Sequence, residues 1–243
     1  MSGINKNCLV IIPTYNEAEN IVLFLNELLQ IDIDVLVVDD NSPDGTGELV
    51  NNIAKTNSSL FLLTRPEKQG LGSAYRAGFD WGIEKKYTSF VEMDADFSHR
   101  IVDLKSMLSI GSKYDLVIGS RYIHLGGTSG WSVGRKLLSK TANLFAGIML
   151  RTRVKDLTSG FRIYSLNALE EILFQTSTTN GYGFQIEMTI RSVDKKLTIK
   201  EIPILFEERR EGSSKMDSKI ILEAFILIFK LFPKRYLGIK VVS

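Results

Sequence analysis

Two aspartates separated by one residue, Asp94 and Asp96, are the side chains of this sequence best suited to chemistry. They follow the predicted strand Phe90–Met93, at whose end both carboxylates can approach one site. Two carboxylates this close repel each other, so a divalent cation is their natural neutraliser. Mg²⁺ and Mn²⁺ prefer oxygen ligands and commonly join protein carboxylates to the phosphates of a substrate. The pair therefore predicts a cation site that holds a phosphorylated ligand.

Two further polar clusters follow predicted strands. The segment Asp39–Thr46 has the composition of a turn in which a polar side chain caps the next helix. A turn alone does not explain the adjacent carboxylates of Asp39 and Asp40. A carboxylate in that position can accept hydrogen bonds from a nucleotide base or ribose. The segment Pro13–Glu17 follows the first predicted strand and adds an aromatic face and a carboxylate.

The elements that must position these clusters alternate between strand and helix in the first half of the chain. Short apolar runs predict strands that are buried on both faces, and helical spacing of apolar residues predicts the helices between them. The pattern predicts an α/β fold whose mostly parallel sheet is covered by helices and binds ligands at the carboxyl ends of its strands. The predicted strands are 9–12, 35–38, 60–63, 90–93 and 116–118, and the helices are 17–29, 48–54, 73–83 and 102–108.

The second half is less regular but is not separated from the first by a linker. We expect a single catalytic domain over residues 1–217 and an amphipathic segment over residues 218–243. The predicted helices of this half are 133–149, 166–174 and 185–193, and the predicted strands are 161–164 and 197–206.

Several classes of protein are excluded or disfavoured. The first strand is not followed by the glycine-rich turn of a dinucleotide-binding fold, and no Walker lysine motif is present. The single cysteine, Cys8, excludes an intrachain disulfide and is expected in the core. No secretory signal is found, so we expect a cytoplasmic protein. From Arg191 onward the chain has 12 Lys and Arg against 7 Asp and Glu, which favours an anionic partner for this end.

In chain order, these clusters resemble those of the family 2 glycosyltransferases. Within that family they are most similar to the dolichol- or polyprenol-phosphate mannosyltransferases, over roughly residues 8 to 232. Besides the three clusters above, the motifs that carry the resemblance are Gly70-Leu71-Gly72, Gly119-Ser120-Arg121-Tyr122, Trp131, Arg135, Ser139, Asn143, Asp156 to Arg162, Gly181 to Glu187, Arg209 and Gly212 to Lys215.

The resemblance implies a GT-A fold and the inverting transfer of mannose from GDP-mannose to a polyprenyl phosphate, with Mg²⁺ or Mn²⁺ as cofactor. It places the metal at Asp94 and Asp96. Ser98 stands where some relatives have glutamine as a further metal contact. By motif position, the residues expected to bind the nucleotide sugar are Pro13, Tyr15, Glu17, Val38, Asp40, Asp94, Ala95, Asp96, Arg121, Arg209 and Lys215.

The same resemblance assigns phosphate-handling roles to Arg121, Arg135, Arg209 and Lys215, and we expect Asp96, Arg121 and Arg135 to be catalytic. Chemistry supports such an assignment. A phosphate monoester with a second pKa of about 6 is largely dianionic at neutral pH and needs no general base. Catalysis then consists of aligning two phosphorylated reactants and neutralising the departing diphosphate.

A polyprenyl acceptor lies in a membrane, yet the sequence contains no transmembrane span. The best candidate, Ile220–Phe232, has 13 residues, where a span needs about 20. Glu223 and Lys230 share one helical face and leave a broad apolar face. We expect an interfacial helix on the cytoplasmic face of an anionic membrane, with packing on the protein core as the alternative. The resemblance also allows for a small membrane partner subunit, and no nucleic-acid partner is expected.

Two other functions remain open at this point. The same fold could transfer glucose or another hexose from a UDP-sugar, to polyprenyl phosphate or to a glycan. A non-catalytic nucleotide-sugar-binding subunit is the second alternative. Loss of the aspartate pair or of the arginines would mark such a subunit, and Asp94, Asp96, Arg121 and Arg135 are all present.

Overall fold

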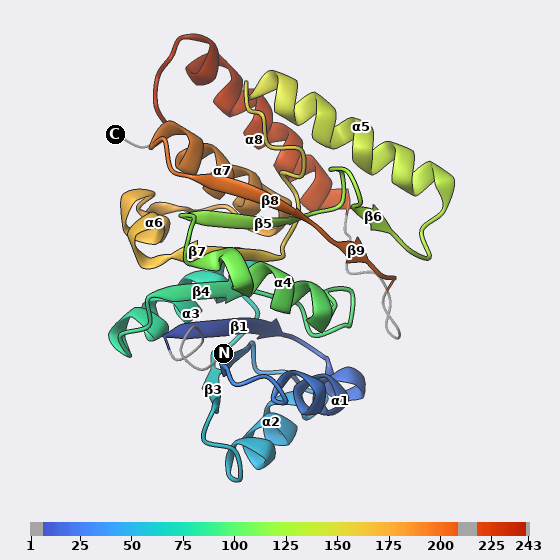
Figure 1. Ribbon diagram of the computed structural model, residues 1–243, viewed down its shortest axis with the longest axis vertical. Helices are drawn as coiled ribbons and strands as arrows, with labels where there is room; N and C mark the ends of the chain where they lie inside the picture. Colours follow the sequence, from blue (N-terminus) through green and yellow to red (C-terminus); the bar gives the residue numbers. More distant parts are fainter. Residues whose placement is uncertain (1–6, 209–217, 242–243) are drawn as a thin grey trace.

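A seven-stranded sheet forms the centre of the molecule, with helices on both of its faces (Figure 1). The computed structural model describes residues 7–208 and 218–241. The strand order is β3-β2-β1-β4-β7-β5-β8, and β7 alone in this sheet runs antiparallel to its neighbours. The strands are β1 (Cys8–Thr14), β2 (Asp34–Asp39), β3 (Leu60–Thr64), β4 (Ser89–Glu92), β5 (Leu116–Ser120), β7 (Arg162–Ser165) and β8 (Ile199–Pro203).

The helices divide between the two faces of the sheet. Apolar residues of α3, α6, α7 and α8 pack with one face, while those of α1, α2 and α4 pack with the other. Residues Leu9 to Ile12 of β1 are fully buried, with side chains towards both faces of the sheet, as their continuous apolar run predicts. The helices are α1 (Ala18–Leu28), α2 (Thr46–Ala54), α3 (Leu71–Glu84), α4 (Ile101–Gly111), α5 (Val133–Met149), α6 (Leu166–Glu171), α7 (Gly181–Asp194) and α8 (Ser218–Tyr236), with a 3₁₀ turn at Phe174–Thr176.

The predicted α/β class with a mostly parallel sheet is confirmed, and two predicted elements differ. The strand predicted over 197–206 is divided into β8 and β9 (Leu205–Phe206), and β9 pairs with β6 (Gly127–Thr128) in a second, small sheet. The division follows Pro203, which cannot donate a backbone hydrogen bond, and the buried Ile204. The helix predicted over 166–174 ends at Glu171, because Leu173 takes a left-handed conformation with φ 49°.

The strand order brings the sequence clusters together. β1 lies between β2 and β4, so the segments that follow these three parallel strands meet at one edge of the sheet. Because β7 is antiparallel, its amino end lies at that same edge, beside the carboxyl end of β5. The chain preceding β7 therefore reaches Arg121, which follows β5. We call the edge of the sheet at which β1, β2, β4 and β5 end the carboxyl edge.

The packing of α3 on the sheet requires glycine. A Cβ atom at Gly78 would lie 2.5 Å from Cγ2 of Ile11, and one at Gly82 would lie 2.7 Å from Cε1 of Phe90. Real Cβ atoms do not approach other atoms so closely, so a larger residue would push α3 away from β1 and β4. The close approach of α3 to β1 and β4 therefore fixes the position of this helix relative to the carboxyl edge.

We expect Gly78→Ala to lower the free energy of unfolding by roughly 1–3 kcal/mol, because the added methyl group overpacks the core. Urea unfolding followed by circular dichroism would measure it. Gly134→Ala is the control, since a Cβ at Gly134 meets no described atom within 4 Å. That change should leave stability unchanged or raise it by less than about 1 kcal/mol. Equal effects of the two substitutions would contradict the close-packing account.

Candidate active site

The aspartate pair lies in the loop after β4, and its backbone is held by two side chains. Oδ1 of Asp96 accepts a hydrogen bond of 3.0 Å from the backbone N–H of Ser98. Nδ1 of His99 accepts one of 3.0 Å from the backbone N–H of Asp94. The buried His99 ring stacks on Phe161 at a centroid distance of 4.6 Å. The loop is thus fixed to the amino end of β7, and the position of the pair is set before any ligand arrives.

The residues present suit a cation that is completed by ligand oxygens. Among the described residues, no group of three or more His, Cys, Asp or Glu side chains could hold a metal ion by itself. Two carboxylates plus substrate phosphates and water are, however, the usual environment of Mg²⁺. The side chain of Asp94 is one-third exposed, whereas Asp96 is buried. Oγ of Ser98 is buried and has no hydrogen-bond partner in the described part of the chain.

A buried polar network lies behind the pair. Oε2 of Glu92 accepts a hydrogen bond of 2.9 Å from Nε2 of Gln185 on α7. Arg162 is fully buried and donates to five oxygens, among them the backbone carbonyl of Gln185 and the hydroxyl of Tyr164. Burial raises the pKa of Glu92 to about 7, and the Arg162 charge opposes that rise only in part. Glu92 therefore gains and loses its proton near neutral pH.

The two carboxylates at the end of β2, Asp39 and Asp40, have different partners. Asp39 accepts hydrogen bonds from the Thr14 hydroxyl at 2.7 Å and from the Ser42 hydroxyl at 2.6 Å, so it joins β1 to the turn after β2. Asp40 accepts from Nε of Arg65 at 2.6 Å, and both side chains are buried. Arg65 was not identified from the sequence, although it directly follows β3 at the same carboxyl edge. Its charge neutralises the carboxylate proposed to meet the nucleotide.

The residues that the sequence predicts to bind the nucleotide from β1 and the turn after it lie beside β2 and α2. Pro13 pairs with Val38 in the register of β1 and β2, and Val38 is fully buried. The half-buried Tyr15 has Nζ of Lys68 4.3 Å from the centre of its ring. The backbone N–H of Glu17 donates to the Thr46 hydroxyl at 3.0 Å, which ties this turn to the start of α2.

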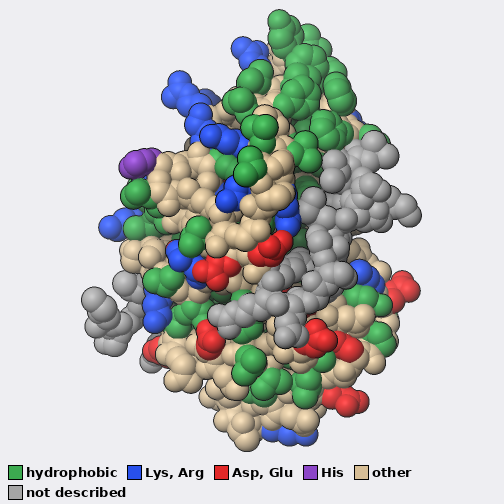
Figure 2. Space-filling model, turned by 90° about the vertical axis from the view of Figure 1, so that its right-hand side faces the viewer, with side chains coloured by type: hydrophobic (Ala, Val, Ile, Leu, Met, Phe, Trp, Pro, Cys, Tyr) green, Lys and Arg blue, Asp and Glu red, His purple; other side chains and the backbone are tan. Residues whose placement is uncertain are grey.

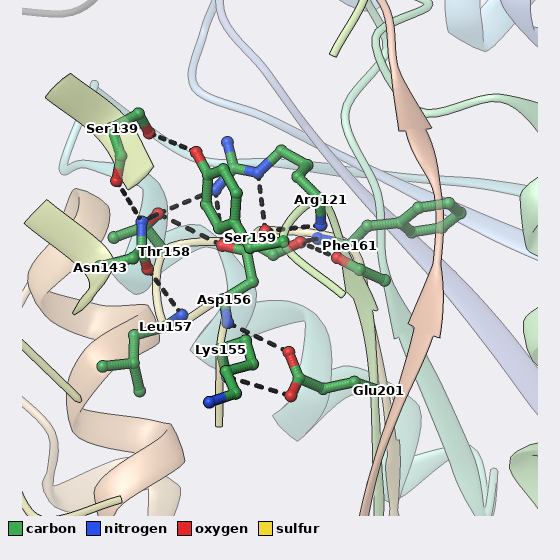
Figure 3. Close-up of polar contacts among 12 residues, drawn as sticks. Arg121, Ser139, Asn143, Lys155, Asp156, Leu157, Thr158, Ser159, Phe161 and Glu201 are labelled. Carbon is green, nitrogen blue, oxygen red and sulfur yellow. Dashed lines mark hydrogen bonds and ion pairs between the residues drawn. The ribbon is translucent and has the colours of Figure 1, made fainter. Parts of the chain in front are cut away.

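On the other side of the site, Arg121 is bound to Asp156 (Figure 3). Nε and Nη2 of Arg121 donate to the two carboxylate oxygens of Asp156, each at 2.7 Å, and the backbone N–H adds a third bond of 2.9 Å. Nη2 also donates to the Thr158 hydroxyl at 2.8 Å. Burial alone would lower the pKa of Arg121, but Asp156 holds that pKa above its ordinary value. The planar guanidinium is oriented by its partner rather than by solvent.

The guanidinium groups of Arg135 and Arg121 both lie near the ring of Trp131. The guanidinium of Arg135 lies 4.1 Å from the centre of this ring, and that of Arg121 lies 5.7 Å from it. Nη1 of Arg135 is 3.2 Å from Oε1 of Glu208 in a partly exposed ion pair. The structure thus brings together two of the four predicted phosphate-binding cations. The other two, Arg209 and Lys215, lie outside the described residues.

Phe206 connects the aspartate loop to the arginines. Its ring centre lies 5.6 Å from that of His99, 5.5 Å from that of Trp131 and 5.5 Å from the Arg121 guanidinium. The backbone N–H of Glu207 donates to the carbonyl of Ser98 at 3.2 Å. The aspartate pair and a cationic, aromatic cluster therefore flank one site, an arrangement suited to two phosphorylated reactants. Neither Phe206 nor Glu92 was identified from the sequence, because each lies in an apolar run that predicts only a strand.

We expect Glu92→Gln to remove a pH-dependent loss of stability. The folded protein keeps the Glu92 proton up to a pKa of about 7, whereas the unfolded chain loses it near the usual 4.5. The free energy of unfolding of the wild type therefore falls as pH rises through this interval. The variant carries no such proton, so its stability relative to wild type should rise by up to a few kcal/mol. Urea unfolding between these pH values would measure it, with the exposed Glu48→Gln as control. Parallel profiles for wild type and Glu92→Gln would contradict this assignment.

The chain matches known proteins in both sequence and structure. A polyprenol monophosphomannose synthase of Mycolicibacterium smegmatis is 42% identical over 227 residues, which cover 92% of this chain and 86% of that protein. An undecaprenyl-phosphate mannosyltransferase of Micrococcus luteus is 44% identical over 220 residues, which cover 90% of each chain.

Solved structures share the fold at much lower identity. The glucosyl-3-phosphoglycerate synthase of Mycobacterium tuberculosis, solved with Mn²⁺, UDP-glucose and phosphoglyceric acid, aligns with a TM-score of 0.66 and 18% identity, covering 96% of this chain and 80% of that one. A mannosyltransferase of Pyrobaculum calidifontis, solved with GDP-mannose and Mn²⁺, aligns with a TM-score of 0.59 and 17% identity, covering 96% and 69%. These matches confirm the expected GT-A-like architecture.

The family model described as glycosyl transferase family 2 matches residues 9–173. That match covers more than half of the chain and includes the aspartate pair, Arg121 and Asp156, so this protein belongs to glycosyl transferase family 2.

Proposed function

We propose that this protein transfers mannose from GDP-mannose to a polyprenyl phosphate, with inversion at the sugar carbon. Relatives that align over nine-tenths of the chain are named for mannose transfer to such lipid phosphates. The observation that carries the proposal is the convergence of two phosphate-binding arrangements on one edge of the sheet. Asp94 and Asp96 lie on one side, and Phe206 links them to Arg121 and Arg135 on the other.

The donor is proposed to occupy the side formed by β1, β2 and β4. Tyr15 offers a half-buried aromatic face, and the Asp40 carboxylate, oriented by Arg65, can accept hydrogen bonds from the base or ribose. Asp94 and Asp96 would hold Mg²⁺ or Mn²⁺ against the diphosphate. When bound, this cation neutralises the charge that develops on the departing nucleoside diphosphate. Ser98, Arg209 and Lys215 remain proposed contacts to the metal or the donor.

The acceptor phosphate is proposed to meet Arg135 and the guanidinium edge of Arg121. One phosphate oxygen attacks the anomeric carbon as the bond from that carbon to the diphosphate oxygen breaks. The dianionic phosphate needs no base to remove a proton, and the buried His99 accepts a backbone hydrogen bond at Nδ1. The chain's own contribution is to orient the two reactants and to offset their negative charge.

The proposed acceptor places the protein at a membrane surface. No helix in the described parts of the chain is both long enough and apolar enough to cross a bilayer. We propose peripheral attachment at the cytoplasmic face through residues 218–243, with a small membrane subunit as a further partner.

A direct assay tests this function. Purified protein is given labelled GDP-mannose or UDP-glucose, a polyprenyl phosphate and either Mg²⁺ or Mn²⁺, and the lipid is then extracted. We expect label in the lipid from GDP-mannose and none without the divalent cation. Transfer from UDP-glucose in its place would favour the hexosyltransferase alternative. No transfer from either donor would contradict the proposal and favour a non-catalytic nucleotide-sugar-binding subunit.

We expect Asp96→Asn to reduce transfer about a hundredfold or more, because the amide removes the charge that holds the cation. The fold should persist, since an amide oxygen can still accept the hydrogen bond from the Ser98 backbone. Mn²⁺ binding followed by electron paramagnetic resonance should weaken in parallel. Asp32→Asn, at an exposed position before β2, is the charge-matched control. Full activity of Asp96→Asn would overturn the metal assignment.

A further inference from the structure

The strand β8 forms one open edge of the seven-stranded sheet (Figure 1). It pairs with β5, whose Leu116 backbone N–H donates to the carbonyl of Thr198 at 3.1 Å. Parallel pairing uses every second residue, so this register directs the backbone N–H and C=O groups of Ile199 and Glu201 away from β5. In the described part of the chain, no residue forms a hydrogen bond with these outward groups. A strand edge of this kind can pair with an added strand.

A pocket of about 480 Å³ opens beside this edge. Ile199 and Glu201 line it from β8, and the chain that follows α5 contributes residues 151–154. That chain is held in place, because Val154 is buried and the Glu201 carboxylate accepts two backbone hydrogen bonds. The donors are the N–H groups of Lys155 at 3.0 Å and Asp156 at 3.1 Å (Figure 3). The pocket is therefore formed before any ligand binds.

Basic side chains surround the pocket, whereas the acidic ones nearby are already bound within the protein. The segments 151–156 and 193–201 contain the basic residues Arg151, Arg153, Lys155, Lys195, Lys196 and Lys200. Among the described residues, none of these six belongs to an ion pair. Asp156 binds Arg121, and the Glu201 carboxylate binds backbone N–H groups. Asp194 pairs with Arg235. The charge around the pocket is thus predominantly positive.

This positive charge favours an anionic partner. The side of the molecule that contains the carboxyl edge carries acidic and basic side chains together (Figure 2), so a rim of one sign distinguishes the pocket. The rim includes part of the basic excess that the sequence shows from Arg191 onward. A second copy that paired its own β8 with this β8 would bring like charges together, which is unfavourable. An acidic segment of another protein has the complementary charge.

The pocket also suits an extended backbone. Successive side chains of a strand point in opposite directions, so an added strand can direct apolar and acidic side chains to different sides. Val193, Leu197 and Ile199 give the pocket an apolar surface, and the basic residues lie around it. The outward groups of β8 supply main-chain hydrogen bonds, which provide affinity in this mode of peptide recognition.

We propose that this pocket binds an acidic, extended segment of a partner protein, which adds to β8 as a further strand of the sheet. The partner's backbone pairs with Ile199 and Glu201, its carboxylates meet the basic rim, and its apolar side chains enter the pocket. Docking at this edge needs neither the donor nor the acceptor of the proposed transfer, so the two proposals can fail separately.

Fluorescence anisotropy of a labelled peptide, in which glutamate alternates with valine, tests the docking on the full chain. Arg153→Glu should weaken binding about tenfold or more, because it reverses a charge at the pocket. Lys105→Glu on α4 is the control, since it changes the net charge equally at another exposed position. We expect this control to weaken binding less than about twofold in physiological salt. Both side chains are exposed, so both variants should melt at the wild-type temperature.

Ile199→Pro tests the backbone contact. Proline removes the outward N–H of this residue but no hydrogen bond to β5, and Pro203 already occupies an equivalent outward position in β8. Ile199→Ala is the matched control, because it shortens the side chain and keeps the N–H. The proline variant should bind the acidic peptide at least about threefold more weakly than the alanine variant. Equal binding by these two variants would overturn the strand addition.

The remaining outcomes identify other occupants. A peptide with lysine in place of glutamate should not bind. Equal binding of the acidic peptide by Arg153→Glu and Lys105→Glu would overturn the proposal. If inorganic phosphate competes and methylation of the valine nitrogens has no effect, the pocket is a site for small anions instead. Wild-type self-association that Arg153→Glu abolishes, without peptide binding, would overturn the proposal in favour of a second copy of this chain.

Discussion

The antiparallel pairing of β7 between β4 and β5 is the interaction on which the site depends. The parallel strands β1, β2 and β4 place the polar clusters that follow them at the carboxyl edge. Because β7 runs the other way, the chain from Asp156 to Phe161 arrives at that edge and supplies partners to both halves. Asp156 binds Arg121, and Phe161 stacks on His99, which holds the Asp94 backbone. A parallel strand in this position would begin at the opposite edge.

Buried charges around the site are largely compensated before any reactant binds. Asp40 is paired with Arg65, and Arg121 with Asp156, in both cases through short hydrogen bonds. Breaking such a pair costs several kcal/mol in a buried setting, so these groups are unlike surface charges that reorient with solvent. Preorganised dipoles and charges of this kind need no rearrangement during a reaction in which negative charge moves, as it would from acceptor to leaving diphosphate in the proposed transfer.

The sequence predicted the order of most elements and the polar clusters that follow β1, β2 and β4, because strand periodicity and strand ends are local signals. It also placed Arg121 and Arg135 in one site through their motifs. It could not reveal which carboxylate Arg121 contacts, that Arg65 pairs with Asp40, or that Phe206 joins the two sides, since these are contacts between distant segments. The environment of residues 218–243 was also difficult to predict from the sequence. The apolar residues of one helix can face the protein core and a membrane at once.

The thickness of α5 sets a length scale for the proposed lipid substrate. A helix with its side chains is about 10 Å across, so the cluster around Arg135 is separated by about that distance from the exposed residues Val133 and Leu144 on the opposite side of α5. With the protein attached to a membrane as proposed, it would meet the phosphate and only the first isoprene units, and the rest of the tail would stay in the bilayer. This arrangement would select among lipid substrates by the depth at which the phosphate lies rather than by the length of the tail. Polyprenyl phosphates of different lengths should then be nearly equivalent substrates.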